Sequence, residues 1–301
     1  MYLDDLYLFR ISKFEFRILK RMDPSKKNTY IIAAISLIVI TAIVYFLFFF
    51  QKSPKEIKDE DQTEEVVQVA ELEVAQRPYV TLTPTADGAE IVMSVENMDA
   101  FDKIEYELTY LADNPQVPGQ KLQRGATGTD VNTKDPKYKK SILLGTASKG
   151  VRSIDTGIES GRLALHMFKG DKEYLSETEW DLFKIGLAKT NIKDSKGTFD
   201  LEVPQLNKTY WAILADTVGI PKSDEFDPNK VILPVWGTFS ISPEFQQVAN
   251  LKITAEVKEP KLYSFNHQDG TVEELESDFD EKTNTISAEV KNLATFIVSS
   301  E

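Results

Sequence analysis

The chain has 301 residues, of which 42% are hydrophobic and 28% charged, a composition that indicates a globular protein of up to two ordinary domains. It contains no cysteine, which excludes disulfide bonds, thiolate nucleophiles and cysteine-based zinc or iron–sulfur sites. Residues 1–51 carry a net charge of +3 and residues 52–301 a net charge of −16. Because the larger, acidic segment would repel phosphate backbones, we expect no nucleic-acid partner.

Residues 1–29 form a basic segment, predicted to be cytoplasmic, and two interpretations of it remain open. In the first, a basic amphipathic helix lies on the inner membrane leaflet, because the basic side chains of residues 10–21 share one arc of a helical wheel. In the second, translation starts at Met22, and the residues before it are absent from the native protein. The intact mass of the native protein would separate the two.

Residues 30–50 contain no charged side chain and predict a single transmembrane helix in contact with the lipid bilayer. The run is longer than the apolar region of a cleaved signal peptide, and no small-residue cleavage site follows it, so we expect an uncleaved signal anchor. Basic residues precede the run and acidic residues follow it. The positive-inside rule then places the N-terminus in the cytoplasm and the C-terminal region outside the plasma membrane.

Residues 51–76 are rich in Lys, Glu, Asp and Gln and predict an acidic stalk or linker. From residue 77 onward, apolar and polar residues alternate with a period of two, which is typical of half-buried strands because successive side chains point to opposite faces. Turn signals rich in Asp, Asn, Gly and Pro separate these runs. We predict strands over residues 80–82, 89–95, 104–110, 163–167, 199–203, 251–257 and 286–290.

Many short strands and few helical stretches predict an all-β ectodomain built as two tandem immunoglobulin-like β-sandwiches. A polar segment at residues 186–197 is the expected boundary, giving domain A over residues 77–185 and domain B over residues 196–301. Within domain A, residues 112–140 contain few apolar side chains and predict a long exposed loop.

Neither histidine has the sequence setting of a zinc site or a catalytic triad. His166 is predicted on the outward side of its strand, and His267 lies in a predicted hairpin turn. The acidic segment 278–284 is interpreted as a hairpin turn between strands at 272–275 and 285–290, because Lys282 occupies a position where a calcium loop needs a ligand. We therefore predict no catalytic, cofactor-binding or metal-binding residue, although a pair of carboxylates remains open in so acidic a region.

Aromatic residues supply the only candidate ligand contacts. Tyr210, Trp211 and Trp236 lie in the predicted second domain, and Trp180 closes the first. Exposed tryptophans on a sandwich stack on sugars, whereas buried ones fill the core, and the core interpretation is favoured.

The order of four segments of domain B, at residues 197–204, 231–239, 260–263 and 286–298, resembles the β-sandwich module of ankyrins and netrin receptors. It is also similar to the repeats that end many bacterial surface proteins, and the whole chain resembles uncharacterised bacterial membrane-anchored proteins. Some relatives of the module cleave themselves at a His-Phe-Ser tripeptide, where this chain has Asn292, Leu293 and Ala294. The hydroxyl nucleophile and its base are both missing, so the resemblance implies a binding or spacer role.

These features predict a single-pass, membrane-anchored extracytoplasmic protein with a binding, adhesion or assembly role and no catalytic activity. Its expected partner is an envelope protein or a glycan, besides the lipid bilayer. An alternative is a cell-envelope glycan hydrolase that uses a carboxylate pair.

Overall fold

A computed structural model describes residues 72–242 and 244–300, which belong to one compact unit. The predicted basic segment 1–29, the predicted transmembrane helix 30–50 and most of the predicted stalk 51–76 lie outside the described residues. Among the residues that are described, no helix has the length and apolar character needed to cross a membrane. The predicted anchor therefore stays a prediction.

The described part is all-β and antiparallel, as predicted, with two short 3₁₀ turns as its only helical elements. Three larger sheets and one hairpin contain all of its strands. The three-stranded sheet has the order β1 (Tyr79–Pro84), β2 (Glu90–Glu96), β5 (Lys137–Leu143). The five-stranded sheet has the order β10 (Thr190–Lys193), β11 (Phe199–Val203), β14 (Glu244–Thr254), β18 (Thr285–Asn292), β17 (Ser277–Asp280).

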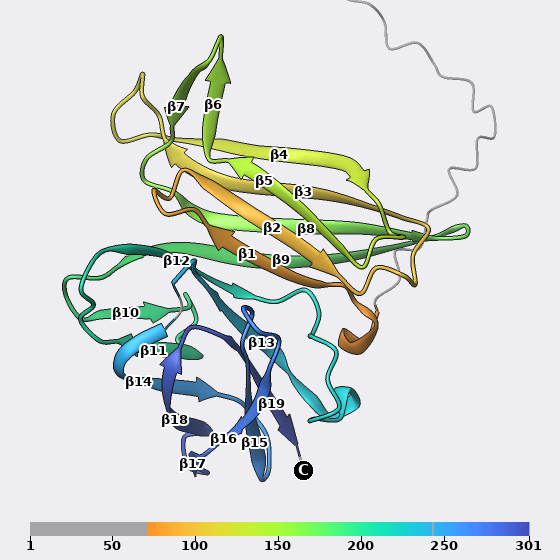
Figure 1. Cartoon of the computed structure of the whole chain (residues 1–301), viewed down its shortest axis with the longest axis vertical. Coiled ribbons are helices and arrows are strands. Elements are labelled where there is room, and N and C mark those ends of the chain that lie inside the picture. The colour runs from red at the N-terminus through yellow and green to blue at the C-terminus, as the bar shows by residue number, and fades with distance from the viewer. Residues whose placement is uncertain (1–71, 243, 301) are drawn as a thin grey trace, which may run out of the picture. The chain divides into compact units, whose positions relative to one another are not determined.

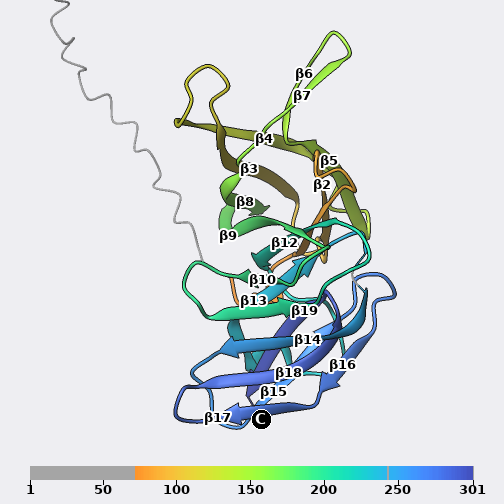
Figure 2. The ribbon, with the colours of Figure 1, turned by 90° about the vertical axis from the view of Figure 1, so that its left-hand side faces the viewer.

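The nine-stranded sheet connects the two regions seen in Figures 1 and 2. Its order is β16 (Val272–Leu275), β15 (Pro260–Phe265), β19 (Thr295–Ser300), β13 (Val231–Phe239), β12 (Tyr210–Asp216), β9 (Lys172–Ile185), β8 (Glu159–Lys169), β3 (Lys103–Asp113), β4 (Lys121–Val131). Because β9 pairs directly with β12, this sheet continues across the predicted boundary at residues 186–197. The segment between them adds β10 and β11 to the five-stranded sheet.

The first core lies between the three-stranded sheet and the β3–β8–β9 part of the nine-stranded sheet. Ile91 and Met93 of β2 face this core, as do Leu108 of β3, Leu165 of β8 and Trp180 of β9. All five side chains are at most 1% exposed. Burying side chains of this size stabilises the fold by about 1.5–3 kcal/mol each.

The second core lies between the five-stranded sheet and the opposite face of the nine-stranded sheet. Phe199 of β11 is at its centre, with ring centroids 5.4 Å from Trp236 and 6.2 Å from Phe296. Leu251 of β14 and Ile286 of β18 complete the contribution of the outer sheet. The apolar alternation predicted for β11, β14 and β18 therefore forms one face of this core.

The middle of the nine-stranded sheet is buried on both faces. In β12, Ile213 and Ala215 point into the first core, whereas Ala212 and Leu214 point into the second. A strand covered on both faces needs an apolar residue at every position, which explains the uninterrupted apolar run in β12.

A smaller third cluster covers the remaining inner face of β13, β15 and β19. It includes Val235, Tyr263 and Ile297 from these strands, and Ile220 and Phe226 from the segment that joins β12 to β13. The 3₁₀ turns η1 (Val74–Gln76) and η2 (Pro228–Lys230) belong to the segments that cover this face. This face of the nine-stranded sheet is thus covered by long connections, whereas the other parts of the sheet pack against a second sheet.

The hairpin of β6 (Gly145–Ser148) and β7 (Val151–Ile154) pairs with no other described strand and projects from the rest of the fold in both views (Figures 1 and 2). Val151 is 71% exposed, and every residue of β7 is exposed. This hairpin contributes no side chain to the three cores.

Most predicted strands are confirmed, and three details of the prediction are wrong. The predicted loop 112–140 contains the whole of β4 and the start of β5. The turn at 280–285 joins β17 to β18, whereas the predicted strand at 272–275 is β16 and pairs with β15 in the other sheet. The predicted strand 251–257 ends at Thr254, because its partner β18 begins opposite that residue at Thr285.

Candidate functional site

The structure separates the candidate aromatic residues. Tyr210 and Trp211 are neighbours at the start of β12, so their side chains point to opposite faces. Trp211 is half-buried and packs on the turn between β1 and β2, where a Cβ at Gly88 would lie 2.5 Å from the indole ring. Tyr210 packs at the edge of the second core, and the ammonium group of Lys208 lies 5.2 Å from its ring centroid.

Trp236 lies far from these two residues along the sheet. It pairs with Asp216, five residues along β12 from Trp211, which corresponds to about 17 Å of strand. Trp236 is 7% exposed and Trp180 is 1% exposed, and both fill cores as expected. Tyr210, Trp211 and Trp236 therefore form no common stacking platform.

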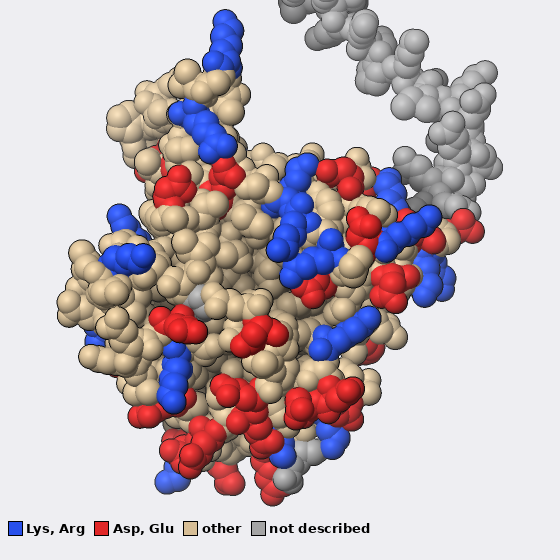
Figure 3. Space-filling model, in the orientation of Figure 1, with Lys and Arg blue, Asp and Glu red and all other residues tan. Residues whose placement is uncertain are grey.

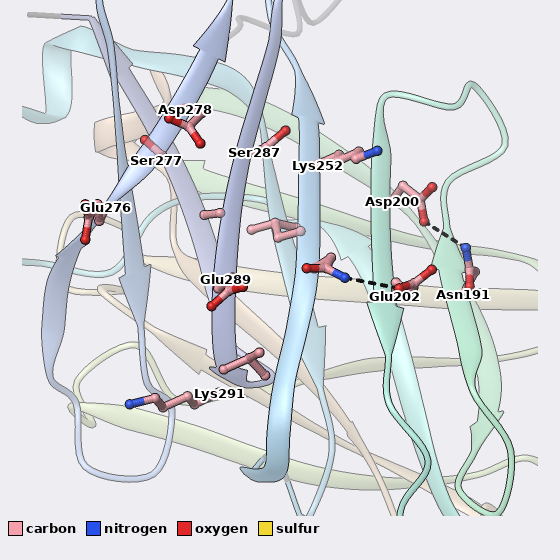
Figure 4. A pocket seen from close by; sticks show the side chains of 14 residues that line it. Asn191, Asp200, Glu202, Lys252, Glu276, Ser277, Asp278, Ser287, Glu289 and Lys291 are labelled. Atoms are coloured by element: carbon pink, nitrogen blue, oxygen red, sulfur yellow. Dashed lines mark hydrogen bonds between the residues drawn. The ribbon is translucent and has the colours of Figure 1, made fainter.

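A polar groove of about 680 Å³ crosses the outer face of the five-stranded sheet (Figure 4). Its lining has five carboxylates and two ammonium groups, together with amides and hydroxyls. The lining residues are Asn191, Asp200, Glu202, Val248, Asn250, Leu251, Lys252, Glu276, Ser277, Asp278, Ser287, Ala288, Glu289 and Lys291. No aromatic side chain is among them, so any ligand here would be held by hydrogen bonds and charge.

Strand register arranges the side chains of the polar groove in transverse rows. One row consists of Asn191, Glu202, Asn250 and Glu289, because each is paired with the next across neighbouring strands. A parallel row runs from Lys193 through Asp200, Lys252 and Ser287 to Asp278. Neighbouring strands lie about 4.8 Å apart, so each row offers polar groups at regular intervals.

The two sides of the polar groove differ in whether their polar side chains already form hydrogen bonds or ion pairs with other described residues. On the β10–β11 side, Glu202 accepts hydrogen bonds from Asn250 at 3.1 Å and from Lys189 at 2.5 Å, and the Lys189 ammonium is the main cause that lowers the Glu202 pKa. Asp200 is bonded to Asn191 at 3.3 Å and to Lys193 at 2.9 Å.

On the β18–β17 side, four charged side chains have no hydrogen bond or ion pair with any other described residue. These are Glu276, Asp278, Glu289 and Lys291. Figure 4 shows them on the side of the groove away from the Asp200–Asn191 contact. This side of the groove therefore presents charged groups that are free to bind a ligand.

A second hollow, the acidic cleft, has a volume of about 320 Å³ and lies where β9, β12 and β13 meet the β10–β11 turn. Its apolar wall contains Leu214, Trp236 and the cis-linked pair Leu233–Pro234. The remaining lining residues are polar: Glu179, Asp181, Asp194, Ser195, Lys196, Thr198 and Asp216. Four carboxylates and one ammonium group thus surround an apolar wall.

Two of these carboxylates already accept hydrogen bonds from neighbouring residues of the fold. Asp194 accepts hydrogen bonds from the backbone N–H groups of Phe199 at 2.6 Å and Lys196 at 2.9 Å, and from the hydroxyl of Thr198 at 3.1 Å, which fixes the β10–β11 turn. Asp216 accepts from the backbone N–H of Glu179 at 2.9 Å and from the hydroxyl of Thr178.

Asp181 differs from these two because it has no hydrogen-bond or ion-pair partner in the described part of the chain. It is half-buried, and this burial raises its pKa, with further contributions from the negative charges of Glu179 and Asp194. The indole Nε1 of Trp236, in the apolar wall, is buried and also has no partner among the described residues. The lining of the acidic cleft therefore includes one residue with an unpaired acceptor and one with an unpaired donor.

The histidines lie apart from both hollows. His166 is half-exposed and bonded to Glu173 at 2.7 Å, in agreement with the predicted outward position. His267 lies in the predicted turn and is half-buried, with its Nε2 atom buried, its Nδ1 3.1 Å from the Tyr79 hydroxyl and its ring 4.8 Å from that of Phe239. Within the described ranges, no group of three or more His, Asp or Glu side chains has the arrangement of a metal site.

Comparisons with protein-family models, with curated proteins and with solved structures find no match to this chain. The resemblance of residues 196–301 to the module of ankyrins and netrin receptors stays a prediction from the sequence. The assignment of function therefore depends on the chemistry of the polar groove and the acidic cleft.

Proposed function

We propose that this chain is a single-pass, membrane-anchored protein that binds a partner outside the cytoplasm and has no catalytic activity. Residues 30–50 would cross the plasma membrane, with residues 1–29 in the cytoplasm. The described region would form two tandem immunoglobulin-like β-sandwiches that share the nine-stranded sheet. Residues 51–76 would act as a stalk that holds these sandwiches away from the membrane surface.

The observation that carries this proposal is the set of charged side chains without partners on the β18–β17 side of the polar groove. Glu276, Asp278, Glu289 and Lys291 are arranged on one sheet face without partners among the described residues. Carboxylates accept hydrogen bonds and the ammonium group donates them, so this face suits a ligand rich in hydroxyl or amide groups. An envelope glycan or a polar surface of an envelope protein has this character.

The first test is site-specific cross-linking in native cells. A photoreactive amino acid at Ser287, in the second row of the polar groove, should give a defined adduct of the full-length chain. The matched control is the same amino acid at Asp171, an exposed residue in the turn between β8 and β9 that is not among the residues lining the groove. Equal labelling at both positions, or none at Ser287, would contradict a binding role for the groove.

The second test measures affinity and separates the two kinds of partner. Purified full-length chain is titrated with soluble cell-wall glycan fragments, and E289Q is compared with D171N. Loss of one hydrogen bond to a charged group should weaken binding by roughly tenfold in E289Q, whereas D171N should bind like the unaltered chain. A protein adduct in cells together with no glycan binding would identify a protein partner.

One observation favours a second candidate, a glycan hydrolase acting in the acidic cleft. A general acid needs a carboxyl group whose pKa is raised, and burial raises the pKa of Asp181 beside the carboxylates of Glu179 and Asp194. The test is release of reducing ends from cell-wall glycan by the full-length chain. Turnover that D181N abolishes would replace the proposed binding function with this one.

A further inference from the structure

The acidic cleft is distinct from the polar groove in both position and chemistry. The groove lies on the outer face of the five-stranded sheet, whereas the cleft is lined by the nine-stranded sheet and the β10–β11 turn. Within β9, Glu179 and Asp181 lie on the same face as Phe183 and Ile185, which pack in the second core. The two acids therefore continue an apolar strand face beyond the end of the core.

The cleft combines two surfaces that no described residue satisfies. Of its apolar wall, which faces a hollow of about 320 Å³, Leu214 and Trp236 are buried in the second core, whereas Leu233 is 51% exposed and Pro234 is also exposed. A half-buried carboxylate without a partner, such as Asp181, is unfavourable in the free protein, because water solvates it less well than at the surface. A ligand that supplies both a cation and an apolar stem would satisfy both surfaces.

The Trp236 side chain gives independent support for a ligand at this position. It is 7% exposed, it is one of the residues that line the cleft, and its Nε1 has no acceptor in the described part of the chain. Buried indole N–H groups usually find an acceptor. Peptide carbonyl groups are acceptors of this kind.

We propose that the acidic cleft binds a lysine or arginine side chain of a polypeptide partner. The aliphatic stem of such a side chain packs on the exposed Leu233 and Pro234, and its charged end pairs with Asp181. The other charged groups around the cleft are Glu179 on β9, Asp194 and Lys196 in the β10–β11 turn, and Asp216 on β12. Three of these four groups are negative, so the field at the site favours a cation.

The chemistry of the lining argues against a divalent cation as the occupant. Asp194 and Asp216 already accept hydrogen bonds from backbone N–H groups, and the wall opposite them is apolar. Calcium requires six to eight oxygen ligands. An organic cation with a hydrocarbon stem fits this combination better than a bare metal ion.

The test uses two small probes, Nα-acetyl-lysine amide and Nα-acetyl-norleucine amide, which share the same aliphatic stem and differ in the terminal ammonium group that norleucine lacks. Saturation-transfer NMR on the full-length chain should detect the lysine probe and show little transfer to the norleucine probe. D181N preserves the shape of the side chain, removes its charge, and should weaken lysine binding by roughly tenfold. D171N is the matched control and should leave binding unchanged.

Three outcomes would overturn the proposal. Equal transfer to both probes would mean that the cleft is only an apolar surface. Unchanged lysine binding in D181N would place the cation elsewhere. Calcium binding to the full-length chain, measured by calorimetry and lost in D181N, without lysine binding would identify a metal site. The groove variant E289Q should bind the lysine probe normally, so failure here is distinguishable from failure of the proposed function.

Protonation of Asp181 provides a second readout. Because the pKa of Asp181 is raised, its carboxylate is lost at a higher pH than that of an ordinary aspartate. Lysine binding should therefore decrease as the pH is lowered, before the surface aspartates are protonated. In D181N the remaining binding should lack this step.

Discussion

Strands β12 and β4 belong to the same nine-stranded sheet but are stabilised in different ways. β12 is central, and its residues 212–215 are buried in cores on both faces. β4 is one of the two edge strands, pairs only with β3, and has a single buried residue, Val131. Position in the sheet, rather than strand length, therefore decides how many side chains of these two strands are buried.

The edge strand is protected by charge rather than by burial. Lys121 pairs with Asp113 at 3.1 Å, and Arg124 lies 3.6 Å from Asp155. Charged side chains on an edge disfavour pairing with a second chain. β4 therefore depends on its backbone hydrogen bonds to β3, whereas β12 depends on apolar contacts in two cores.

Surface charge divides the described region in a similar way. Residues 77–185 contain 14 Lys and Arg against 17 Asp and Glu, whereas residues 186–301 contain 11 against 19. On the face shown in Figure 3, acidic side chains predominate in the lower part, and basic ones gather in the upper part. Both candidate sites lie partly or wholly in the more acidic region, which is consistent with cationic or hydroxyl-rich partners.

The largest expected effect comes from a leucine in the centre of the sheet. Leu214→Ala removes a side chain that is 2% exposed, and should lower the free energy of unfolding by about 2–5 kcal/mol. Leu122→Ala is the matched change on β4, where the side chain is only half-buried, and should have a much smaller effect. Urea denaturation of the full-length variants measures both; similar effects would contradict the comparison.

The same experiment examines whether the two cores unfold together. Ile213 faces the first core and Leu214 the second, although they are neighbours in β12. If the shared sheet couples the cores, Ile213→Ala and Leu214→Ala should each shift one common transition. Two separate transitions, each sensitive to one variant, would indicate independent folding of the predicted domains.

The second expected effect depends on pH and concerns His267, which is half-buried and whose Nε2 atom is buried. Burial lowers the pKa of His267 from 6.5 to about 4, so the unfolded chain binds a proton at a higher pH than the folded chain. The free energy of unfolding should therefore decrease as pH falls from about 6.5 to about 4, by about 3 kcal/mol from this group. Above pH 6.5 the contribution no longer changes.

The measurement compares denaturation of the full-length chain at pH 7 and pH 4 in the unaltered protein, His267→Phe and His166→Gln. Phenylalanine cannot titrate, so the pH dependence should be smaller in His267→Phe. His166→Gln, which removes a half-exposed histidine from β8, is the control. An equal pH dependence in all three proteins would show that the burial of His267 has no such energetic effect.

The alternation of apolar residues was sufficient to predict the strands whose faces differ. Residues 104–110 in β3 and 199–203 in β11 have one buried and one polar face, and both strands were predicted. β4 was missed because an edge strand with glycines and charged residues has the composition of a loop. The pairing of β9 with β12 was also not predicted, because the alternation of residues within one strand does not show which other strand it pairs with.

The two hollows could be predicted only in part. Trp236 was a candidate from the sequence, and it lines the acidic cleft. A signal for Asp181 was present, because in β9 it alternates with the buried Trp180 and shares a face with Ile185. The polar groove had no such signal, since its rows arise when distant strands such as β10 and β18 join one sheet.

The third expected effect concerns a buried hydroxyl in central strand β13. The Thr238 hydroxyl donates to the carbonyl of Ala294 at 2.9 Å and accepts from its N–H at 3.0 Å, where the chain passes from β18 to β19. Thr238→Val keeps the shape but leaves that N–H unpaired, which should cost about 1–3 kcal/mol. Thr190→Val on edge strand β10 removes only an exposed hydrogen bond and serves as the control for denaturation.

The smallest expected effect is in the projecting β6–β7 hairpin. Val151 is 71% exposed and touches none of the cores, so Val151→Asp should change the free energy of unfolding by less than about 0.5 kcal/mol. An apolar side chain stabilises the fold only when it is buried, so an exposed one adds little to the free energy of unfolding and matters mainly where it binds a partner. A clear drop in the urea midpoint would mean that the hairpin packs against another part of the protein in solution. An unchanged midpoint would instead show that side-chain contributions to stability fall from the central strand β12, through the edge strand β4, to almost nothing in a hairpin outside the three cores.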